Sequence, residues 1–253
     1  RMAGEGRSRD AETARLEAEH DPEISVVMHV VNEEGNAADE VDELAQRLCE
    51  DVRSAESVFV DDGSSDGTST EAAKALAAVP HQLLRHASNR GIGAALKTGV
   101  RAAKGSWVTF LPADGQIAPS AIGTLRAAAT ADGSDVVFSV YDHRDDGFHR
   151  KVLSAGVRGL ILLVHGVRMR SDGPYLFRRS LFDADKLAPD TFFLNFEFPI
   201  RMLGAGVASS VVTIECRPRR SGQSKSTGLR RIYGVAQDLL DLRVRRLREG
   251  LGR

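Results

Sequence analysis

Acidic side chains follow two apolar runs of the chain, each in a turn that also contains glycine. Asp61 and Asp62 come directly after the run 57–60, and Asp114 follows the run 106–111. Ligands of open α/β sheets bind outside the carboxyl ends of the strands. Carboxylates placed there can hydrogen-bond a ribose or a base, or hold a hard divalent cation against a diphosphate. The arrangement predicts a metal-assisted nucleotide site.

The segments that would position these turns alternate between strand-like and helix-like patterns. Apolar runs predict strands at 23–31, 58–60, 82–85, 108–111 and 135–140. Helical periodicity predicts helices at 36–52, 70–78, 93–104 and 119–130. Past residue 140 the alternation ends, and we expect a charged loop at 142–151, a helix at 150–167 and a strand at 211–215. The pattern is typical of an α/β fold with a mainly parallel sheet.

The composition is that of an ordinary globular enzyme, with 42% hydrophobic and 27% charged residues in a chain of 253. Its charge is unevenly distributed. Residues 1–62 hold 18 acidic and 6 basic side chains, whereas residues 217–253 hold 11 basic and 3 acidic ones. A basic end suits an anionic partner such as a phosphate or a membrane surface, and a solvated tail explains the same distribution.

Compartment signals in the sequence are few. Cys49 and Cys216 lack metal-ligand spacing and are expected to be core thiols in a reducing compartment. Residues 1–22 are charged throughout and show no signal-peptide pattern. The longest apolar run, 159–164, is far shorter than the roughly 20 residues that a membrane span needs. We therefore expect a cytoplasmic protein that is soluble or peripheral on the inner face of the membrane.

Five segments, in order along the chain, resemble family 2 glycosyltransferases of the GT-A fold. They are Ser25–Asn36, Val60–Thr68, Asn89–Ala95, Ala113–Gln116 and Arg219–Lys225. The last is similar to the Arg-x-x-Gly-x-Ser-Lys element of dolichyl-phosphate mannose synthases and related polyprenyl-phosphate sugar transferases. Each segment alone is a weak signal, but five in order are specific. The resemblance runs from about residue 24 to 226 and implies an inverting hexosyltransferase that uses a UDP- or GDP-linked sugar.

The resemblance also implies which residues bind the nucleotide. They are Val31, Glu33, Asp61, Asp62, Ser64, Asn89, Gly91 and Asp114. The turn after residue 60 is equally an Asx turn with a helix N-cap, and both interpretations can hold together. Gly91-Ile92-Gly93 is also similar to a dinucleotide fingerprint, but its third glycine position is Leu96 and it follows the third strand, so we reject that interpretation. The simpler alternative is a helix start whose glycines permit close packing.

A metal site is implied by the second acidic turn. Asp114 matches the second acid of the family's Asp-x-Asp, and Pro112 stands in place of the first. Gln116 matches a glutamine that gives an amide oxygen to the metal in the polyprenyl-phosphate subgroup. Mg²⁺ or Mn²⁺ held there would stabilise the charge of the leaving diphosphate. The alternative is a plain turn at a strand end.

Other positions depart from the family pattern. His29 and Val31 replace the usual Pro and Tyr before Asn-Glu, and we expect His29 to be structural. An arginine common before the acceptor loop is Val140 here, with Arg144 and Arg150 nearby as substitutes. Either arginine could instead be a solvated charge in a mobile loop.

The acceptor phosphate is expected to bind to basic residues and hydroxyls. The expected set is Arg144, Arg150, Arg219, Ser224 and Lys225. The candidate catalytic residues are Asp114, Asp172 and Glu197. The resemblance implies the last two, because inverting relatives place acidic residues at similar positions. Glu197 could instead orient Arg219 or Lys225, or favour a helix dipole.

Three functions follow from these residues. The first is transfer of a sugar to a polyprenyl phosphate, which is anionic and needs little help from a base because its second pKa is about 6. The second is transfer to a hydroxyl of a small molecule in secondary metabolism, which needs a base such as Asp172 or Glu197. The third is a non-catalytic nucleotide-binding protein. We expect no nucleic-acid partner, and a homodimer is left open.

The chain divides into three expected parts. Residues 1–22 form a flexible extension, 23–226 the GT-A catalytic domain, and 227–253 a basic amphipathic helix. That helix could lie on an anionic membrane or pack on the catalytic domain, and its wide apolar face favours packing.

Overall fold

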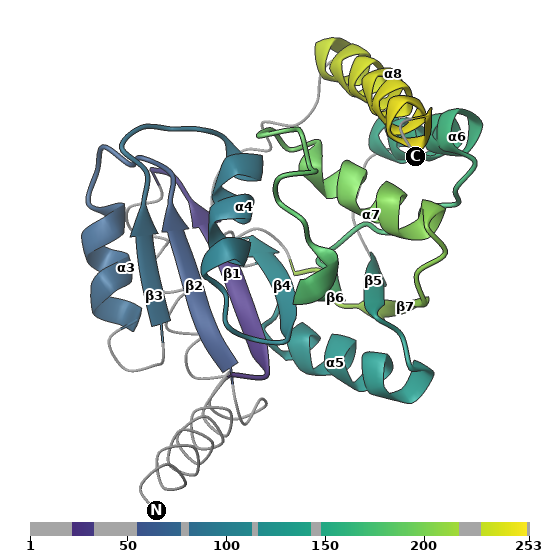
Figure 1. Cartoon of the computed structure of the whole chain (residues 1–253). Coiled ribbons are helices and arrows are strands. Elements are labelled where there is room, and N and C mark those ends of the chain that lie inside the picture. Colours follow the sequence, from purple (N-terminus) through teal and green to yellow (C-terminus); the bar gives the residue numbers. More distant parts are fainter. Residues whose placement is uncertain are drawn as a thin grey trace, which may run out of the picture.

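A mixed sheet is the centre of the fold (Figure 1). The computed structural model describes residues 22–32, 55–76, 81–112, 116–142, 148–217 and 229–251. Its strands are β1 (Ile24–Val30), β2 (Ala55–Asp61), β3 (His81–Arg85), β4 (Trp107–Pro112), β5 (Val136–Tyr141), β6 (Leu176–Arg178) and β7 (Ser209–Ile214). Their order is β3-β2-β1-β4-β6-β5-β7. Only β6 runs antiparallel to its neighbours β4 and β5, so the predicted mainly parallel α/β sheet is confirmed.

Helices cover both faces of the sheet. They are α3 (Thr68–Leu76), α4 (Ile92–Ala102), α5 (Ser120–Asp132), α6 (Phe148–His165), α7 (Leu194–Gly204) and α8 (Leu229–Leu251), with a 3₁₀ turn, η1, at Arg179–Leu181. One apolar cluster joins the sheet to α3 and α5, and a second joins the opposite face to α4 and α7. Along β1, Val26 and Met28 enter the first cluster and Val27 the second. Burial on both faces explains why this strand is an almost continuous apolar run.

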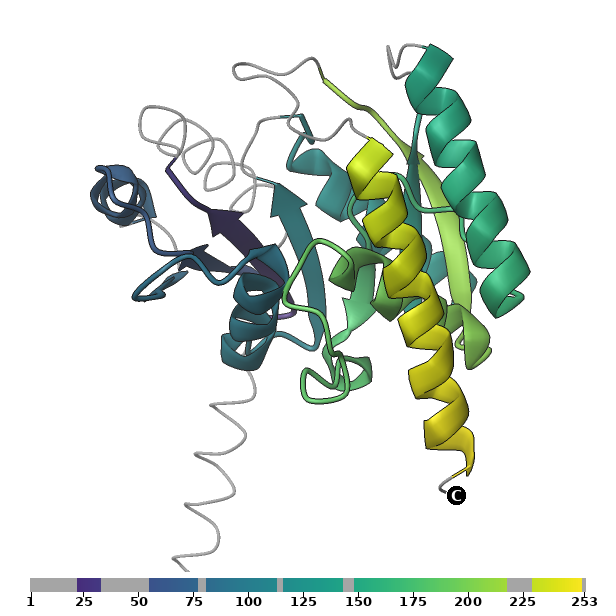
Figure 2. The ribbon, with the colours of Figure 1, turned by 90° about the horizontal axis from the view of Figure 1, so that it is seen from above.

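Helices α6 and α8 form an additional layer. The two helices lie side by side in both views, and Figure 1 shows them above the sheet, on the side toward which the arrow of β2 points (Figures 1 and 2). A third apolar cluster, which includes Ile161, Ile200, Leu239 and Leu242, packs them against α7. No helix within the described ranges is both long and apolar enough to cross a bilayer.

Most of the expected elements are present within a few residues of their predicted ends. Helix α6 begins at Phe148, inside the segment expected to be a loop. Strand β6, η1 and α7 were not among the expected elements. The helix expected at 36–52 lies outside the described residues.

Candidate functional site

The carboxyl ends of β1, β2 and β3 meet at one edge of the sheet. The backbone N–H of Asp62 donates to Val30 O at 2.9 Å, and that of His86 donates to Asp61 O at 2.9 Å. Gly63 has φ of 76°, and a Cβ there would lie 2.5 Å from the carbonyl carbon of Ser88. The turn after β2 therefore packs directly on the loop after β3, and glycine is required at this contact.

Asp61 presents at this edge a buried oxygen that accepts no hydrogen bond from the described residues. The residue is fully buried, and its Oδ1 accepts a hydrogen bond from Ser64 N at 2.8 Å. Oδ2 lies 3.3 Å from Arg85 Nε but accepts no hydrogen bond from the described residues. Arg85 also donates to Ser64 O at 2.9 Å. A buried acceptor without a donor is costly, so a ligand N–H or O–H is a natural partner for Oδ2.

Asp62 is fully buried as well, but its oxygens are used within the protein. Oδ1 accepts from Arg90 N at 2.9 Å and contacts His86 Nδ1 at 2.6 Å, and Oδ2 accepts from Gly91 N at 2.8 Å. Burial alone would raise the pKa of Asp62, but the donors Arg90 N, His86 and Gly91 N outweigh it and hold the pKa below its usual value. Asp62 is therefore an anion that fixes the loop 86–91.

Two histidines lie on either side of the Asp62 carboxylate. His86 also contacts Thr98 Oγ1 through Nε2 at 3.0 Å. His29 Nε2 lies 3.6 Å from Asp62 Oδ2 and has no hydrogen-bond partner among the described residues. Desolvation lowers the pKa of His29 and outweighs the attraction of Asp62, so this imidazole is neutral near pH 7.

The segment after β1 holds the turn after β2 from the other side. Asn32 N donates to Ser64 Oγ at 3.0 Å, and Asn32 Oδ1 accepts from Ser65 N at 3.0 Å. Asn32 has φ of 51°, a conformation that asparagine tolerates better than most residues. Val31 beside it is half-buried. Asn32, Arg85 and His86 were not among the predicted site residues, although Asn32 belongs to the family-like segment and could have been chosen from it.

The start of α4 is packed closely against a distant loop. Gly91 has φ of 95°, and its N–H also contacts Asn89 Oδ1 at 3.1 Å. Ala94 N donates to Asp190 O at 3.2 Å, and a Cβ on Gly93 would lie 2.6 Å from Thr191 O. The glycines thus permit close packing, as the simpler interpretation of this segment expected.

The predicted metal site lies partly outside the described residues. Asp114 and Glu33 are not described. Gln116 follows directly, and its carbonyl accepts a hydrogen bond from Arg217 N at 2.8 Å, beside a bridge between Ile117 and Cys216. Within the described ranges no three acidic, histidine or cysteine residues group together around a metal position.

The predicted acceptor-phosphate residues are not described either. Arg144, Arg219, Ser224 and Lys225 fall outside the described residues, and Arg150 lies in α6 without a described side chain. The contact between Gln116 and Arg217 nevertheless brings the segment that precedes Arg219 next to the end of the second acidic turn.

Asp172 lies at the carboxyl end of β5. Its N–H donates to Ser139 O at 2.8 Å, and its Oδ1 accepts a hydrogen bond from Arg158 Nη1 of α6 at 2.9 Å. About a third of the Asp172 side chain is exposed. The carboxylate is therefore accessible at the same edge of the sheet as the acidic turns.

Glu197 has a different environment from the one expected of a catalytic acid. It is fully buried, and its two oxygens accept from Arg201 Nε at 2.9 Å and from Arg245 Nη2 at 2.7 Å. Arg245 belongs to α8, so the carboxylate connects α7 to the C-terminal helix. Both oxygens are engaged, and the geometry favours a positioning role over the predicted catalytic one.

Comparison with known proteins identifies the family. The model of glycosyl transferase family 2 matches residues 25–188. The chain belongs to this family. It is 35% identical over 166 residues to the undecaprenyl-phosphate 4-deoxy-4-formamido-L-arabinose transferase of Aeromonas hydrophila, a match that covers 64% of this chain and 50% of the relative. The family 2 chain thus spans about half the length of the curated relatives that it matches.

Solved structures show the same fold. Glucosyl-3-phosphoglycerate synthase from Mycobacterium tuberculosis, in complex with Mn²⁺, UDP and glucosyl-3-phosphoglycerate, has a TM-score of 0.64 at 22% identity and covers 90% of this chain and 81% of its own. The same synthase with Mg²⁺ and UDP has a TM-score of 0.61 at 21% identity, with 90% and 81% covered. The family 2 chain therefore has the GT-A fold, as its sequence predicted.

Proposed function

We propose that this family 2 chain is the catalytic unit of an inverting glycosyltransferase that moves a sugar from a UDP- or GDP-linked donor to a polyprenyl phosphate. The observation that carries the proposal is the match to a relative named as an undecaprenyl-phosphate sugar transferase, together with the family match. The acidic sheet edge supplies the chemistry that such a donor requires.

Donor binding would divide between the two adjacent carboxylates. Asp61 Oδ2 is buried and accepts no hydrogen bond within the described residues, although Arg85 lies 3.3 Å away, so it accepts a hydrogen bond from the base or the ribose. Asp62 holds Arg90 N and Gly91 N and thereby fixes the loop that carries Asn89. Val31, Glu33 and Ser64 complete the proposed nucleoside pocket.

A divalent cation fits the residues of this edge. Asp114 and Gln116 carry carboxylate and amide oxygens, which are the ligands that Mg²⁺ and Mn²⁺ prefer. When bound, the cation would offset the charge that develops on the departing diphosphate. The contact of Arg217 N with Gln116 O at 2.8 Å holds the backbone of one proposed ligand in place.

The acceptor supplies its own nucleophile. An ionised phosphate oxygen attacks the anomeric carbon, the bond from that carbon to the diphosphate oxygen breaks, and the nucleoside diphosphate leaves. No proton has to be removed, because the phosphate is already ionised at neutral pH. Arg144, Arg150, Arg219, Ser224 and Lys225 are the proposed phosphate ligands. A hydroxyl acceptor would need a base instead, and Asp172 is the candidate with an accessible carboxylate.

A transfer assay tests this function directly. UDP- and GDP-sugars, first ranked by thermal shift with and without Mn²⁺, are incubated with undecaprenyl phosphate or with a hydroxyl acceptor, and products are identified by mass spectrometry. We expect a glycosylated polyprenyl phosphate. Product only with the hydroxyl acceptor would favour the soluble transferase, and nucleotide binding without any transfer would favour the non-catalytic protein.

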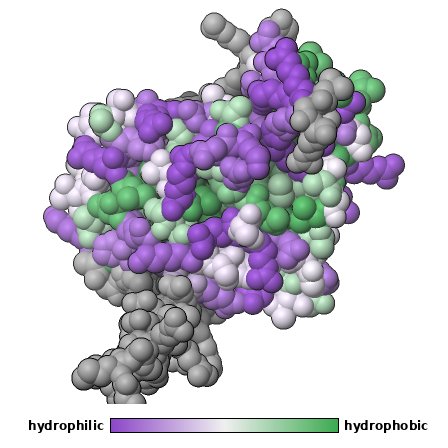
Figure 3. All heavy atoms as spheres, viewed as in Figure 1, coloured by the Kyte–Doolittle hydropathy of each residue, from purple (hydrophilic) through white to green (hydrophobic). Residues whose placement is uncertain are grey.

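Membrane contact is part of the same proposal. Leu240, Val244 and Leu247 recur at helical spacing on α8 and are 57%, 45% and 51% exposed. Leu163 of α6, the neighbouring helix, is 83% exposed. Figure 3 shows hydrophobic and hydrophilic residues side by side where these helices lie. Such a surface suits the interface of an anionic membrane, and each basic residue near it contributes about 1 kcal/mol.

Liposome co-sedimentation tests this contact. Ending the chain at Thr227 would remove Leu239 and Leu242, which are fully buried, so point variants are the better test. We expect Leu240→Ser and Leu247→Ser to weaken binding to anionic vesicles at low salt, with Val211→Ser on β7 as the matched exposed control. Equal binding of all three variants and the wild type would contradict the proposed membrane face.

A further inference from the structure

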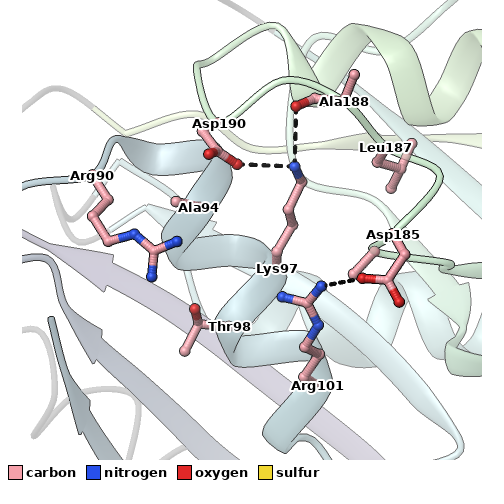
Figure 4. A pocket seen from close by; sticks show the side chains of 10 residues that line it. Arg90, Ala94, Lys97, Thr98, Arg101, Asp185, Leu187, Ala188 and Asp190 are labelled. Carbon is pink, nitrogen blue, oxygen red and sulfur yellow. Dashed lines mark hydrogen bonds and ion pairs between the residues drawn. The ribbon is translucent and has the colours of Figure 1, made fainter.

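A polar pocket lies outside the donor edge, between α4 and the segment 184–190 (Figure 4). Its cavity volume is about 320 Å³. The lining residues are Arg90, Ala94, Lys97, Thr98, Arg101, Ala184, Asp185, Leu187, Ala188 and Asp190. Three cationic and two acidic side chains face a cavity whose remaining walls are largely small apolar groups.

Lys97 is the central cation of this pocket. It is only 8% exposed, and its Nζ donates to Asp190 Oδ1 at 2.9 Å and to Ala188 O at 3.3 Å. An ammonium group has three donors, so one donor has no acceptor among the described residues. A buried and incompletely satisfied ammonium in an open pocket is a position for a ligand oxygen.

Arg90 supplies a second unused cation. Figure 4 shows its side chain extending beside Ala94 along α4. Within the described ranges no hydrogen bond or ion pair reaches the guanidinium, although Arg90 N is held by Asp62 at 2.9 Å. A guanidinium presents a planar fork of donors that matches phosphate oxygens.

Arg101 and the two aspartates complete the recognition groups. Arg101 is paired with Asp185, and the two side chains are 56% and 87% exposed. An ion pair this exposed contributes little, so Arg101 is available to a ligand. Asp190 is 54% exposed, and both carboxylates can accept hydrogen bonds from hydroxyl groups.

We propose that this pocket binds a small phosphorylated polyol, with its phosphate held by Arg90 and Lys97 and its hydroxyls by Asp185 and Asp190. The pocket borders the proposed donor edge, with Arg90 as the residue at the boundary, and ligand binding there does not depend on transfer activity. It is joined to that edge through Arg90, because the backbone of the same residue is fixed by Asp62.

Calorimetric titration of the full chain with glycerol 3-phosphate, in the presence of a chelator, tests the pocket. We expect saturable binding to the wild type and no binding of glycerol. Arg90→Gln and Lys97→Met should each weaken binding at least about tenfold, since each removes a charged phosphate contact. Arg178→Gln, an exposed arginine over Trp107 and outside the pocket, should bind as the wild type does.

A donor-site variant separates the two anion positions. Asp114→Asn should keep full affinity for glycerol 3-phosphate if the pocket binds it. The proposal is overturned if the wild type does not bind, if Arg90→Gln binds equally well, or if Asp114→Asn alone loses binding. Thermal unfolding of each variant verifies that the fold is retained, and Arg90→Gln, at an exposed position, keeps the test decisive if Lys97→Met unfolds.

Discussion

The two halves of the sheet organise charge in opposite ways. From β1 to β4, buried carboxylates at strand ends accept hydrogen bonds from backbone N–H groups, as Asp62 does from Arg90 and Gly91, and the side chains of His86 and Arg85 lie beside them. From β5 to α8, the buried carboxylate of Glu197 is held by arginine side chains on helices. Backbone donors are fixed by the strands and loops around them, whereas arginines bring helices together. The first half is therefore suited to binding a nucleotide in a fixed geometry. The second half is suited to packing helices together into a surface layer.

The largest effect is expected from the acid assigned to the metal. Asp114→Ala should lower transfer by on the order of 10²–10³-fold or more, because the developing charge on the diphosphate loses its stabilisation. The fold should be retained, which circular dichroism checks. Asp142→Ala, an exposed acid after β5, is the matched control and should transfer normally. If the wild type needs the metal but Asp114→Ala turns over at a near-normal rate, Asp114 is not a metal ligand.

The carboxylate of the second half should matter for stability. Glu197→Ala removes the buried carboxylate that Arg201 and Arg245 share and leaves Arg201 with Glu249 alone, and we expect a loss of about 3 kcal/mol in the free energy of unfolding. Glu249, the other partner of Arg201, is half-exposed, and Glu249→Ala should cost about 1 kcal/mol or less. Urea denaturation measures both. Equal small losses would show that Glu197 does not hold α8 in place.

Substitutions of the two adjacent aspartates should differ in their effects on nucleotide affinity and on stability. Asp61→Asn should weaken nucleotide affinity about tenfold, or about 1.4 kcal/mol. Stability should change little, because Oδ2 accepts no hydrogen bond among the described residues and its ion-pair partner Arg85 has a side chain that is 57% exposed. Asp62→Asn should weaken affinity and also lower stability, since it loses charge-assisted bonds to the loop 86–91. Calorimetry and thermal unfolding distinguish the two. Unchanged nucleotide affinity in Asp62→Asn would place that loop outside the site.

The difference between the halves also explains what the sequence could predict. Strands β1 to β5 are apolar runs that stand out from their polar surroundings. The two acidic turns follow β2 and β4, so the strands and the turns could both be located from sequence. Strand β6 has only three residues, too few for a periodic pattern. Helix α7 contains Pro199, which disfavours a helical interpretation.

Contacts between distant residues could not be read from sequence in the same way. A salt bridge of Glu197 to Arg219 or Lys225 was one possibility that the sequence left open beside a helix-dipole role, and the described partners are Arg201 and Arg245. The pocket beside α4 brings Lys97 to Asp190, which is 93 positions away in the sequence. Such pairs depend on how the segment 184–190 crosses the start of α4, and no local pattern encodes that crossing.

The smallest effect concerns two histidines whose pKa is lowered, one in each half. Desolvation lowers the pKa of His29 beside Asp62, with Asp61 and His86 as the other charged neighbours. Burial also lowers the pKa of His165, whose Nε2 contacts Leu239 O of α8 at 3.0 Å and which faces Arg246 and Arg243. Both imidazoles stay neutral in the folded protein at a pH where the unfolded chain already binds a proton.

The sign of the pH dependence follows from these lowered pKa values. As the pH falls through about 6.5, the usual histidine pKa, the unfolded state gains protons that the folded state does not, so stability falls. Asp62 does not contribute in this window, because its stabilisation is lost only below the ordinary carboxylate range. We expect urea denaturation between about pH 7.5 and pH 5.5 to show this decline, and His29→Gln and His165→Gln each to flatten it. A slope unchanged in both variants would mean that the decline arises elsewhere, and flattening in His165→Gln alone would confine it to the contact of α6 with α8.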